Sequence, residues 1–456
     1  MKIIQSAEFD HYWKDLSVQQ QDDGVSTVVM QVIAAVRNEG DEAVRWFATR
    51  FDKSSPDVFE VPQDTVQAAW HNLRDTEPEL AVALELAADH IRRFSALQKS
   101  QFVNFETELA PGLITGQRVL PVQRAAVYVP GGRAPLISSV LMGVIPGVTA
   151  GVDEVFVASP PGEDGLPDPG IMAAAYLAGA KRVFALGGAQ AIAALALGTE
   201  TIPRVDVIVG PGNKYVATAK RLLFGAVGID FVAGPTDVLI IADGSGSTAD
   251  PSKTGSMAID PADIAAADML AQAEHDIDAR ARALVPNREL ADCIAAALEK
   301  RLASLPTAAT AKASLDAGGL IIIYDSREDA LRIAHTIAPE HLELQVTDAD
   351  SWIPLLRNYG SLFIGSRAAE VLGDYAAGIN HTLPTAAGAR FTGGLSVRHF
   401  LKTVTTLRCA SGQGWDAALS AAERIARAEG LIGHAESAVS RKTWVESGCG
   451  SRTPGP

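Results

Sequence analysis

Hydrophobic positions follow a helical spacing in the N-terminal part of the chain and a strand-like spacing afterwards. Residues 1 to about 100 are expected to be mostly helical, because apolar residues recur at helical intervals in residues 25–51 and 79–97. After Pro111 and Gly112, short apolar runs alternate with Ala-rich segments such as residues 171–177 and 189–197. The predicted strands are residues 125–129, 154–158, 182–186, 205–209, 237–241 and 319–324. Strands that alternate with helices predict an α/β fold in which parallel sheets are flanked by helices.

The length of the chain predicts more than one domain, since 456 residues leave room for two or more domains of about 100 to 200 residues each. The expected parts are an N-terminal extension at 1–24, a first α/β domain from 25–127 plus 238–395, a second α/β domain at 128–237, a C-terminal helical piece at 396–440 and a disordered tail at 441–456. The polar, turn-rich segment 244–260 is expected to be a mobile surface loop.

The composition narrows the classes of partner and compartment. The formal net charge of −15 argues against nucleic acid or an anionic membrane as a partner, since both attract clustered Lys and Arg. Cys293, Cys409 and Cys449 are widely spaced and odd in number, so no disulfide framework is expected, in keeping with a reducing cytoplasm. The N-terminus lacks the apolar core of a signal peptide, and no run of about 18 apolar residues could span a membrane.

Candidate chemistry begins at Glu340 and His341, which follow Pro339. Proline biases the residue before it away from helix, so the Glu-His pair is expected on a turn or at the edge of an element, where side chains can reach a substrate. A Glu and a His can divide proton transfers, because His titrates near neutral pH and burial can raise the pKa of a Glu. The alternative is a surface pair without function.

Three further segments combine acids with histidine: residues 272–276 (Gln-Ala-Glu-His-Asp), 373–381 and 428–434. Gln272 and His275 are three positions apart, so on a helix they would share a face. Zinc takes nitrogen from His and oxygen from carboxylates, which makes a metal site one interpretation. The spacing between the segments matches no compact zinc motif, and each His can equally be structural. On charge alone, Glu274 would be a better ligand than Gln272.

Glycine-rich turns follow several predicted strands, at residues 130–132, 187–190 and 210–213. Ligands of α/β sheets bind at the carboxyl ends of strands, where glycine lets the backbone approach a phosphate. None of these turns fits the G-x-G-x-x-G fingerprint of dinucleotide-binding folds, and such turns are common without a ligand. A nucleotide site along one sheet edge is therefore a hypothesis.

Taken together, these motifs resemble those of the histidinol dehydrogenase family over residues 25 to about 440. The matching segments are residues 128–132, 187–191, 210–213, 234–237, 272–276, 339–342, 380–385 and 429–434. The resemblance implies two Rossmann-like parallel-sheet domains with helical N-terminal and C-terminal extensions. It also implies a homodimer whose C-terminal piece reaches the partner's site. The implied reaction is the oxidation of L-histidinol to L-histidine through the aldehyde, with two NAD used in succession, in histidine biosynthesis.

The resemblance also implies a role for each matching site residue. Zinc would be held by Gln272, His275, Asp374 and His434. His341 would take the alcohol proton, and Glu340 would activate the water that hydrates the aldehyde. The implied substrate contacts are Thr236, Gln272, His275, His341, Asp374, Glu429 and His434, and the implied cofactor contacts are Tyr128, Gln190 and Asn213.

The sequence departs from the family pattern in three places, of which residues 390–405 bear on the substrate more than on the reaction type. Thr236 stands where many members of the family carry Ser, which keeps the hydroxyl group. Residues 390–395 and 400–405 look closer to relatives that oxidise other small polar alcohols, such as sulfopropanediol. The segment 244–260 looks longer than usual and could act as a lid or be a neutral insertion.

Overall fold

The computed structural model describes residues 1–17, 24–52, 54–131, 135–245 and 260–442. It divides into two compact units. The larger unit is Met1–Lys99 with Pro121–Phe400, and the smaller unit is Ser100–Leu120 with Leu401–Pro456. Most of the predicted loop 244–260 and nearly all of the predicted tail 441–456 lie outside the described residues. The domain boundaries expected from the sequence remain a prediction.

The first sheet of the larger unit has six parallel strands in the order β1-β11-β10-β9-β12-β13. The strands are β1 (Lys2–Gln5), β9 (Asp237–Ala242), β10 (Arg280–Val285), β11 (Leu320–Ile323), β12 (His341–Gln345) and β13 (Ser361–Ile364). The helices around it are α1 (Ser6–Ser17), α10 (Pro261–Ala273), α11 (Arg288–Leu302), α12 (Ala308–Gly318), α13 (Arg327–Ile337), α14 (Ala349–Trp352) and α15 (Glu370–Tyr375), with a 3-10 turn η1 (Ile353–Leu355). Alternate strand residues point to opposite faces, so Val238 and Ile240 belong to one apolar core while Leu239 and Ile241 belong to another.

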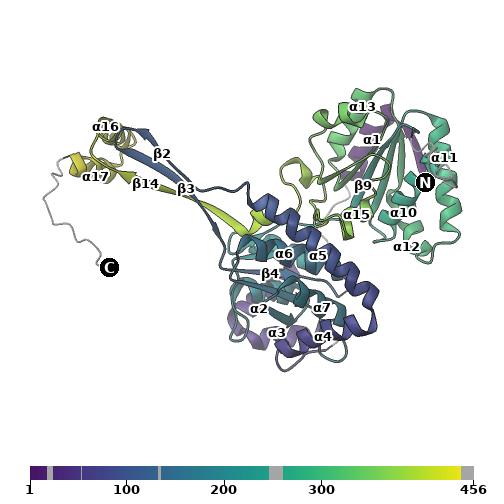
Figure 1. The fold of residues 1–456 in the computed structure, drawn as a ribbon, viewed down its shortest axis with the longest axis horizontal. Coiled ribbons are helices and arrows are strands. Elements are labelled where there is room, and N and C mark those ends of the chain that lie inside the picture. The colour runs from purple at the N-terminus through teal and green to yellow at the C-terminus, as the bar shows by residue number, and fades with distance from the viewer. Residues whose placement is uncertain (18–23, 53, 132–134, 246–259, 443–456) are drawn as a thin grey trace. The chain divides into compact units, whose positions relative to one another are not determined.

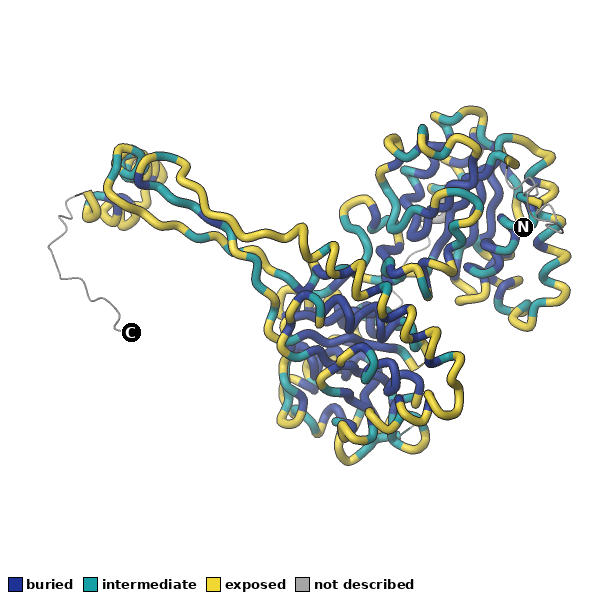
Figure 2. Tube along the Cα trace, viewed as in Figure 1, coloured by how far each residue is buried: buried dark blue, intermediate teal, exposed yellow. Residues whose placement is uncertain are grey.

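The second sheet has five parallel strands in the order β6-β5-β4-β7-β8. They are β4 (Arg124–Tyr128), β5 (Glu154–Ser159), β6 (Arg182–Ala185), β7 (Val207–Val209) and β8 (Gly228–Ile229). One face packs on α2 (Val25–Glu39), α3 (Asp41–Phe51), α8 (Gly188–Leu197) and α9 (Lys214–Leu223) through a shared apolar core. The other helices of this part are α4 (Gln63–Thr76), α5 (Pro78–Lys99), α6 (Ile137–Ala150) and α7 (Pro169–Ala178), and α6 packs on β4 and β5. Figure 1 shows these helices around the strands, and Figure 2 shows that the strands form the buried centre.

The expected α/β class with two parallel sheets is confirmed. The N-terminal extension does more than form a helix, because β1 pairs in parallel with β11 and completes one edge of the six-stranded sheet. Short 3-10 turns η2 (Gly388–Arg390) and η3 (Val397–Phe400) precede the smaller unit. Among the described residues, no helix combines the length and apolarity that a membrane span requires.

The smaller unit joins two distant parts of the sequence. Its sheet has the order β14-β3-β2, built from β2 (Phe105–Ala110), β3 (Leu113–Pro121) and β14 (Leu401–Cys409), and β2 and β3 are antiparallel. Two helices follow, α16 (Gln413–Ala428) and α17 (Ile432–Lys442). In Figure 2 this unit is mostly coloured as exposed or intermediate, so it has little core of its own.

A buried ion pair fixes the turn after β7. Lys220 Nζ and Asp230 form an ion pair in which both side chains are almost fully buried. The pair also binds both backbone groups of Gly210. Lys220 Nζ donates to the Gly210 carbonyl oxygen at 2.9 Å, and the Gly210 N–H donates to Asp230 Oδ2 at 2.8 Å. Gly210 has φ +108°, and a Cβ there would lie 2.2 Å from the carbonyl oxygen of Tyr128, so only glycine lets this turn approach the end of β4.

We predict that Lys220→Met lowers the free energy of unfolding by about 3 kcal/mol or more, because it leaves the buried Asp230 carboxylate without its cation. Urea denaturation monitored by circular dichroism measures the change. The matched control is Lys312→Met, which breaks the exposed Lys312–Asp316 pair and should leave the unfolding midpoint close to wild type. Equal losses in the two variants would contradict the prediction.

Candidate active site

The Glu340–His341 pair lies where helix α13 gives way to strand β12. Helix α13 ends at Ala338, which takes the left-handed conformation at φ 49°, and β12 begins at His341. A non-glycine residue in that region is strained by about 1 kcal/mol or more, and such strain is found most often at functional sites. Glu340 and His341 are both buried. The pair therefore lies at the edge of an element, as expected. Because both residues are buried, the alternative of a surface pair is wrong.

Glu340 is held by the residues that begin the neighbouring strand β9. Thr236 Oγ1 donates to Glu340 Oε2 at 2.5 Å, and the Asp237 N–H donates to the same oxygen at 3.1 Å. In return, the Glu340 N–H donates to Asp237 Oδ1 at 3.2 Å, and Arg282 pairs with the other oxygen of Asp237. Burial raises the pKa of Glu340 to about 7, although His341 and the Thr236 hydroxyl act to lower it. A carboxyl group with this pKa can exchange a proton near neutral pH.

His341 lies among carboxyl groups. Its Nδ1 is 3.3 Å from the carbonyl oxygen of Asp237 and 3.5 Å from Glu370 Oε1, and its Nε2 is 3.6 Å from Asp374 Oδ1. Burial alone would lower the pKa of His341, but Glu370, Glu340 and Asp374 raise it well above the ordinary value. Within the described chain, the buried Nε2 atom has no hydrogen-bond partner. Its nearest charged neighbour, Asp374 Oδ1, lies beyond hydrogen-bond distance, so Nε2 is the ring atom that can bond to a ligand.

A group of possible metal ligands adjoins His341. One ligand atom from each of His275, Glu370 and Asp374 lies within 4.8 Å of the others. Gln272, in the last turn of α10, places one side-chain amide atom 2.7 Å from Thr236 Oγ1 and the other 2.5 Å from Glu370 Oε1. With its nitrogen toward Glu370, the Gln272 amide donates to Glu370 Oε1, and its oxygen accepts from Thr236 Oγ1 and from the Asp237 N–H, so both ends of the amide are satisfied.

The expected ligand segment 272–276 is only partly helical. Helix α10 ends at Ala273, so Gln272 is on the helix while His275 lies just beyond it. Glu274 is exposed and accepts a hydrogen bond from Thr307 at 2.6 Å. Gln272, rather than Glu274, is therefore the residue of this segment that contacts Glu370 and Thr236.

Two expected site residues belong to the smaller unit. Glu429 ends helix α16 as its C-cap, and His434 lies in the first turn of α17. Both are exposed. The larger unit thus brings together Thr236, Gln272, His275, Glu340, His341 and Asp374, and a role for Glu429 and His434 in a site remains a prediction.

A second set of buried polar groups lies on the same face of β12 as His341. Gln345 Nε2 donates to Glu343 Oε2 at 2.6 Å and to Asp268 Oδ2 at 3.0 Å. The Glu370 N–H donates to Glu343 Oε1 at 3.3 Å. Burial, with the charges of Asp268 and Glu370, raises the pKa of Glu343 well above its ordinary range. This set therefore supports the start of α15, the helix that carries Glu370 and Asp374.

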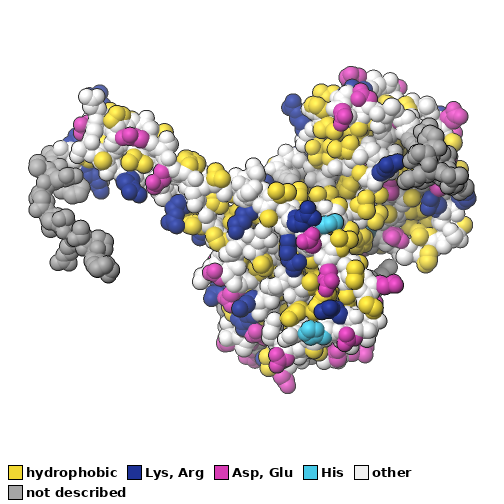
Figure 3. Space-filling model, viewed as in Figure 1, with side chains coloured by type: hydrophobic (Ala, Val, Ile, Leu, Met, Phe, Trp, Pro, Cys, Tyr) yellow, Lys and Arg dark blue, Asp and Glu magenta, His cyan; other side chains and the backbone are white. Residues whose placement is uncertain are grey.

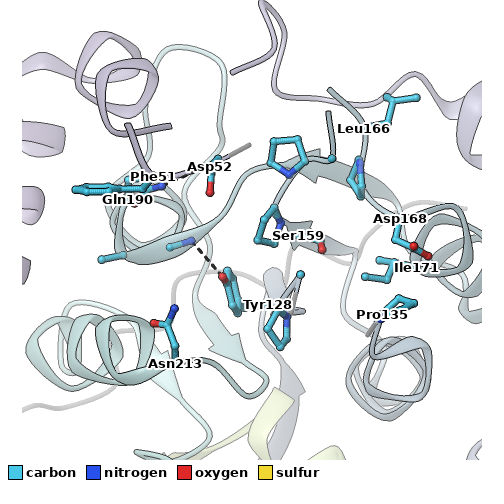
Figure 4. Close-up of a pocket in the computed structure, with 18 of the residues that line it drawn as sticks. Phe51, Asp52, Tyr128, Pro135, Ser159, Leu166, Asp168, Ile171, Gln190 and Asn213 are labelled. Atoms are coloured by element: carbon cyan, nitrogen blue, oxygen red, sulfur yellow. Dashed lines mark hydrogen bonds between the residues drawn. The ribbon is translucent and has the colours of Figure 1, made fainter. Parts of the chain in front are cut away.

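The second sheet contributes a cavity of about 870 Å³ at the carboxyl ends of its strands. Tyr128, Gln190 and Asn213 all line it, as Figure 4 shows. Tyr128 Oη accepts a hydrogen bond from the Gly188 N–H at 3.1 Å, and Asn213 caps helix α9. The N-termini of α8 and α9 both border this cavity, and helix N-termini bind anions such as phosphates. All three glycine turns border this cavity, through Pro130 and Gly131, through Gly188 to Gln190, and through Asn213, so their expected clustering at one sheet edge is seen.

Comparisons with known proteins agree with this arrangement. A family model described as histidinol dehydrogenase matches residues 16–442. The chain belongs to the histidinol dehydrogenase family. The histidinol dehydrogenase of Thermus thermophilus is 45% identical over 417 residues, which cover 91% of this chain and 94% of that protein. The one from Pseudomonas savastanoi pv. phaseolicola is 42% identical over 435 residues, which cover 94% and 91%.

A solved structure shares the fold over the whole length. The crystal structure of histidinol dehydrogenase from Elizabethkingia anophelis has a TM-score of 0.86 and 33% identity to this chain, and the match covers 97% of each. The family resemblance predicted from the sequence motifs is therefore confirmed, and the chain is a member of a dehydrogenase family.

Sequence reasoning missed four acids of this region: Asp237, Asp268, Glu343 and Glu370. Glu370 lies four residues before Asp374 on α15, a spacing that places both on one helix face and could have revealed it. Glu343 alternates with His341 along β12, so the two share a face of the strand. Asp237 gives no such signal, because its contact with Glu340 joins residues that are 103 positions apart.

Proposed function

We propose that this protein oxidises L-histidinol to L-histidine through the aldehyde, with NAD as the oxidant and zinc as a resident metal, in histidine biosynthesis. The proposal depends on one observation above the others: the buried Glu340–His341 pair lies beside the possible ligands Gln272, His275, Glu370 and Asp374 in a member of this family. A cytoplasmic location fits the cysteine usage.

The residues present fit a zinc ion. His275 and Asp374 offer a nitrogen and a carboxylate oxygen, Gln272 offers an amide oxygen, and the site contains more buried carboxyl groups than cations. The proposed ligands are Gln272, His275, Asp374 and His434. Zinc, when bound, would hold the imidazole and amine of the substrate, which orients the reacting carbon. Glu370 adjoins these ligands and would fix their position through Gln272.

His341 is proposed as the base that takes the alcohol proton. Its Nε2 is buried without a hydrogen-bond partner among the described residues, and its Nδ1 is near the Asp237 carbonyl, which fixes the ring. The surrounding carboxylates favour the ring that carries the proton. A zinc ion beside Asp374 would offset these carboxylates and so leave the ring able to accept the proton. His341 would act in this way in both oxidations.

Glu340 is proposed to activate the water that adds to the aldehyde. A general base must be ionised, and the pKa of about 7 means that Glu340 loses its proton only as the pH rises through neutrality. Once ionised, it is held by hydrogen bonds from Thr236 Oγ1 and the Asp237 N–H. Thr236 is also proposed to contact the substrate.

The cavity at Tyr128, Gln190 and Asn213 is the proposed cofactor site. Two helix N-termini border it, which suits a pyrophosphate, and its walls include the apolar side chains of Val28, Val32 and Phe51. NAD supplies the two-electron acceptor for each of the two oxidations. The cavity fits this role without the G-x-G-x-x-G fingerprint.

A homodimer with shared sites is proposed, in which the smaller unit supplies Glu429 and His434 to the partner's substrate and metal. This unit exposes many large apolar side chains, some of which are visible in Figure 3. They are Val103, Phe105, Leu109, Leu407, Ile425, Leu431 and Ile432. Exposed apolar groups of this kind are typical of a surface that another subunit covers.

We predict that the protein reduces NAD when histidinol is the substrate. A chelator should abolish this activity and added zinc should restore it, because the proposed site needs its metal to hold the substrate. Absorbance of NADH measures turnover, and atomic absorption measures the zinc bound per chain. The comparison substrate is sulfopropanediol, which represents the alternative that the enzyme oxidises another small polar alcohol. Turnover of sulfopropanediol in preference to histidinol would refute the proposed substrate, and full activity in metal-free protein would refute the metal site.

We predict that Glu340→Gln slows oxidation of the aldehyde by about 100-fold or more and affects the alcohol step less, because the amide cannot accept the proton of water. In wild type, the aldehyde step should accelerate as the pH rises through about 7, where Glu340 ionises, and the variant should lose this rise. Stopped-flow NADH formation from histidinol and from histidinal separates the two steps.

The matched control for this variant is Glu289→Gln, which changes an exposed acid in the first turn of α11 and should alter neither step. Equal losses on the alcohol and aldehyde steps of Glu340→Gln would contradict the water-activation role.

We predict that mixing Glu340→Gln and His434→Ala subunits restores about a quarter of the wild-type rate of aldehyde oxidation, which each variant alone should lack, because half of the randomly formed dimers are mixed and each has one intact site. The subunits would be mixed by mild unfolding and refolding, and NADH formation measured afterwards. Each variant treated alone is the control. If mixing restores nothing although mixed dimers form, the sites are not shared.

A further inference from the structure

Asp52 places a carboxylate on the wall of the proposed cofactor cavity. The residue ends helix α3, where its N–H donates to the Ala48 carbonyl, so its backbone position is fixed. Its Oδ2 accepts a hydrogen bond from Gln190 Nε2 at 3.3 Å, and its Oδ1 lies against Gly187. A Cβ at Gly187 would lie 2.5 Å from Asp52 Oδ1, so this glycine lets the carboxylate reach the turn after β6. Figure 4 shows Asp52 beside Gln190 at the cavity.

The cavity wall is acidic. Its described lining includes three carboxylates, Asp52, Asp164 and Asp168, and no Lys or Arg. Two of the three are engaged by their own local backbone: Asp168 caps helix α7 through the Gly170 N–H, and Asp164 accepts from the Leu166 N–H. Asp52 is instead held from other elements, by the Gly187 N–H and by Gln190, one of the three proposed cofactor contacts. Each carboxylate oxygen has more than one lone pair, so Asp52 can still accept hydrogen bonds from a ligand beside Gln190.

Asp52 is partly removed from water. Burial raises its pKa to about 6, although hydrogen bonds from Gly187 and Gln190 act to lower it. At neutral pH the Asp52 carboxylate is therefore ionised although it is partly buried. Additional hydrogen-bond donors would stabilise its charge. A ribose supplies such donors, because its two hydroxyl groups can donate to one carboxylate.

The cavity suits the adenosine end of the cofactor rather than the reacting end. The nicotinamide must lie against the substrate carbon near His341, and neither Glu340 nor His341 is among the described lining residues of this cavity. Its apolar wall, with Phe51 and several prolines, suits an adenine ring.

We propose that Asp52 selects NAD over NADP, by accepting hydrogen bonds from the adenosine ribose and by opposing a 2′-phosphate at the same position. This inference deepens the proposed function and depends on it. A 2′-phosphate carries more than one negative charge and would replace the hydroxyl donor, so it would meet the Asp52 carboxylate without a described cation to offset it. The competing explanation is that Asp52 only anchors Gln190 and the turn after β6.

The decisive experiment compares the affinities of NAD and NADP by isothermal titration calorimetry without substrate, in wild type and in Asp52→Asn. We expect wild type to prefer NAD by about 100-fold or more, and Asp52→Asn to narrow this preference by about 10-fold or more. Asp164→Asn is the matched control, because it removes a carboxylate from the same cavity and should leave the ratio of the two affinities unchanged. Steady-state KM values for the two cofactors provide a second comparison.

The outcomes separate the explanations. If Asp52→Asn weakens NAD and NADP equally, Asp52 is only an anchor and the inference is wrong. If wild type binds neither cofactor, the proposed function fails before this inference is tested by any variant. Should Asp52→Asn not fold, 2′-deoxy-NAD tests the wild type directly: we expect it to bind about 10-fold more weakly than NAD, and equal affinity would overturn the inference.

Discussion

The buried carboxyl groups around His341 require positive charge, and the rest of the site depends on how that requirement is met. Six of them are buried: Asp237, Asp268, Glu340, Glu343, Glu370 and Asp374. Arg282 offsets only Asp237, and His341 carries at most one charge. Burial raises the pKa of Glu340 to about 7 and that of Glu370 to about 8, and neighbouring carboxylates add to both shifts, so protons can reduce the remaining negative charge. A divalent cation beside Glu370 and Asp374 would meet the same requirement, and the proposed zinc therefore completes the charge balance of this region.

The two sheets use opposite ends of their strands. In the six-stranded sheet, Thr236 and Glu340 lie just before β9 and β12, and the parallel register that pairs His341 with Val238 sets them side by side. The backbone of β13 comes equally close, since a Cβ at Gly360 would lie 2.5 Å from the Glu340 carbonyl oxygen. In the five-stranded sheet the cavity lies at the carboxyl ends, where ligands of α/β folds usually bind. The proposed proton-transfer groups thus lie on packed strand ends, and the proposed cofactor contacts lie at glycine turns.

The sequence predicted those parts of the structure that depend on local patterns. The alternation of strands and helices gave the α/β class, and the proline before Glu340 correctly placed the Glu-His pair at the edge of an element. Contacts between distant residues were not predictable in this way. Strand β14 joins the sheet of β2 and β3, although almost 300 residues of sequence separate them. Asp237 accepts a hydrogen bond from Glu340, which is 103 residues away. Neither pairing leaves a periodic signal in the sequence. The family resemblance supplied the ligand set, which spacing alone left open.

The proposal of Gln272 rather than Glu274 as a zinc ligand follows from the same need for positive charge. On the chemistry of an isolated site, a carboxylate binds zinc more strongly than an amide, so Glu274 was the more attractive ligand. In the folded chain the ligand region already holds Glu370 and Asp374 beside Glu340, and a further carboxylate would add to their mutual repulsion. An amide contributes an oxygen without charge, while Glu274 remains exposed and bonded to Thr307. As the proposed ligand, the neutral Gln272 is therefore the residue that a crowded acidic site can accommodate, and this becomes evident only once the fold has brought the acids together.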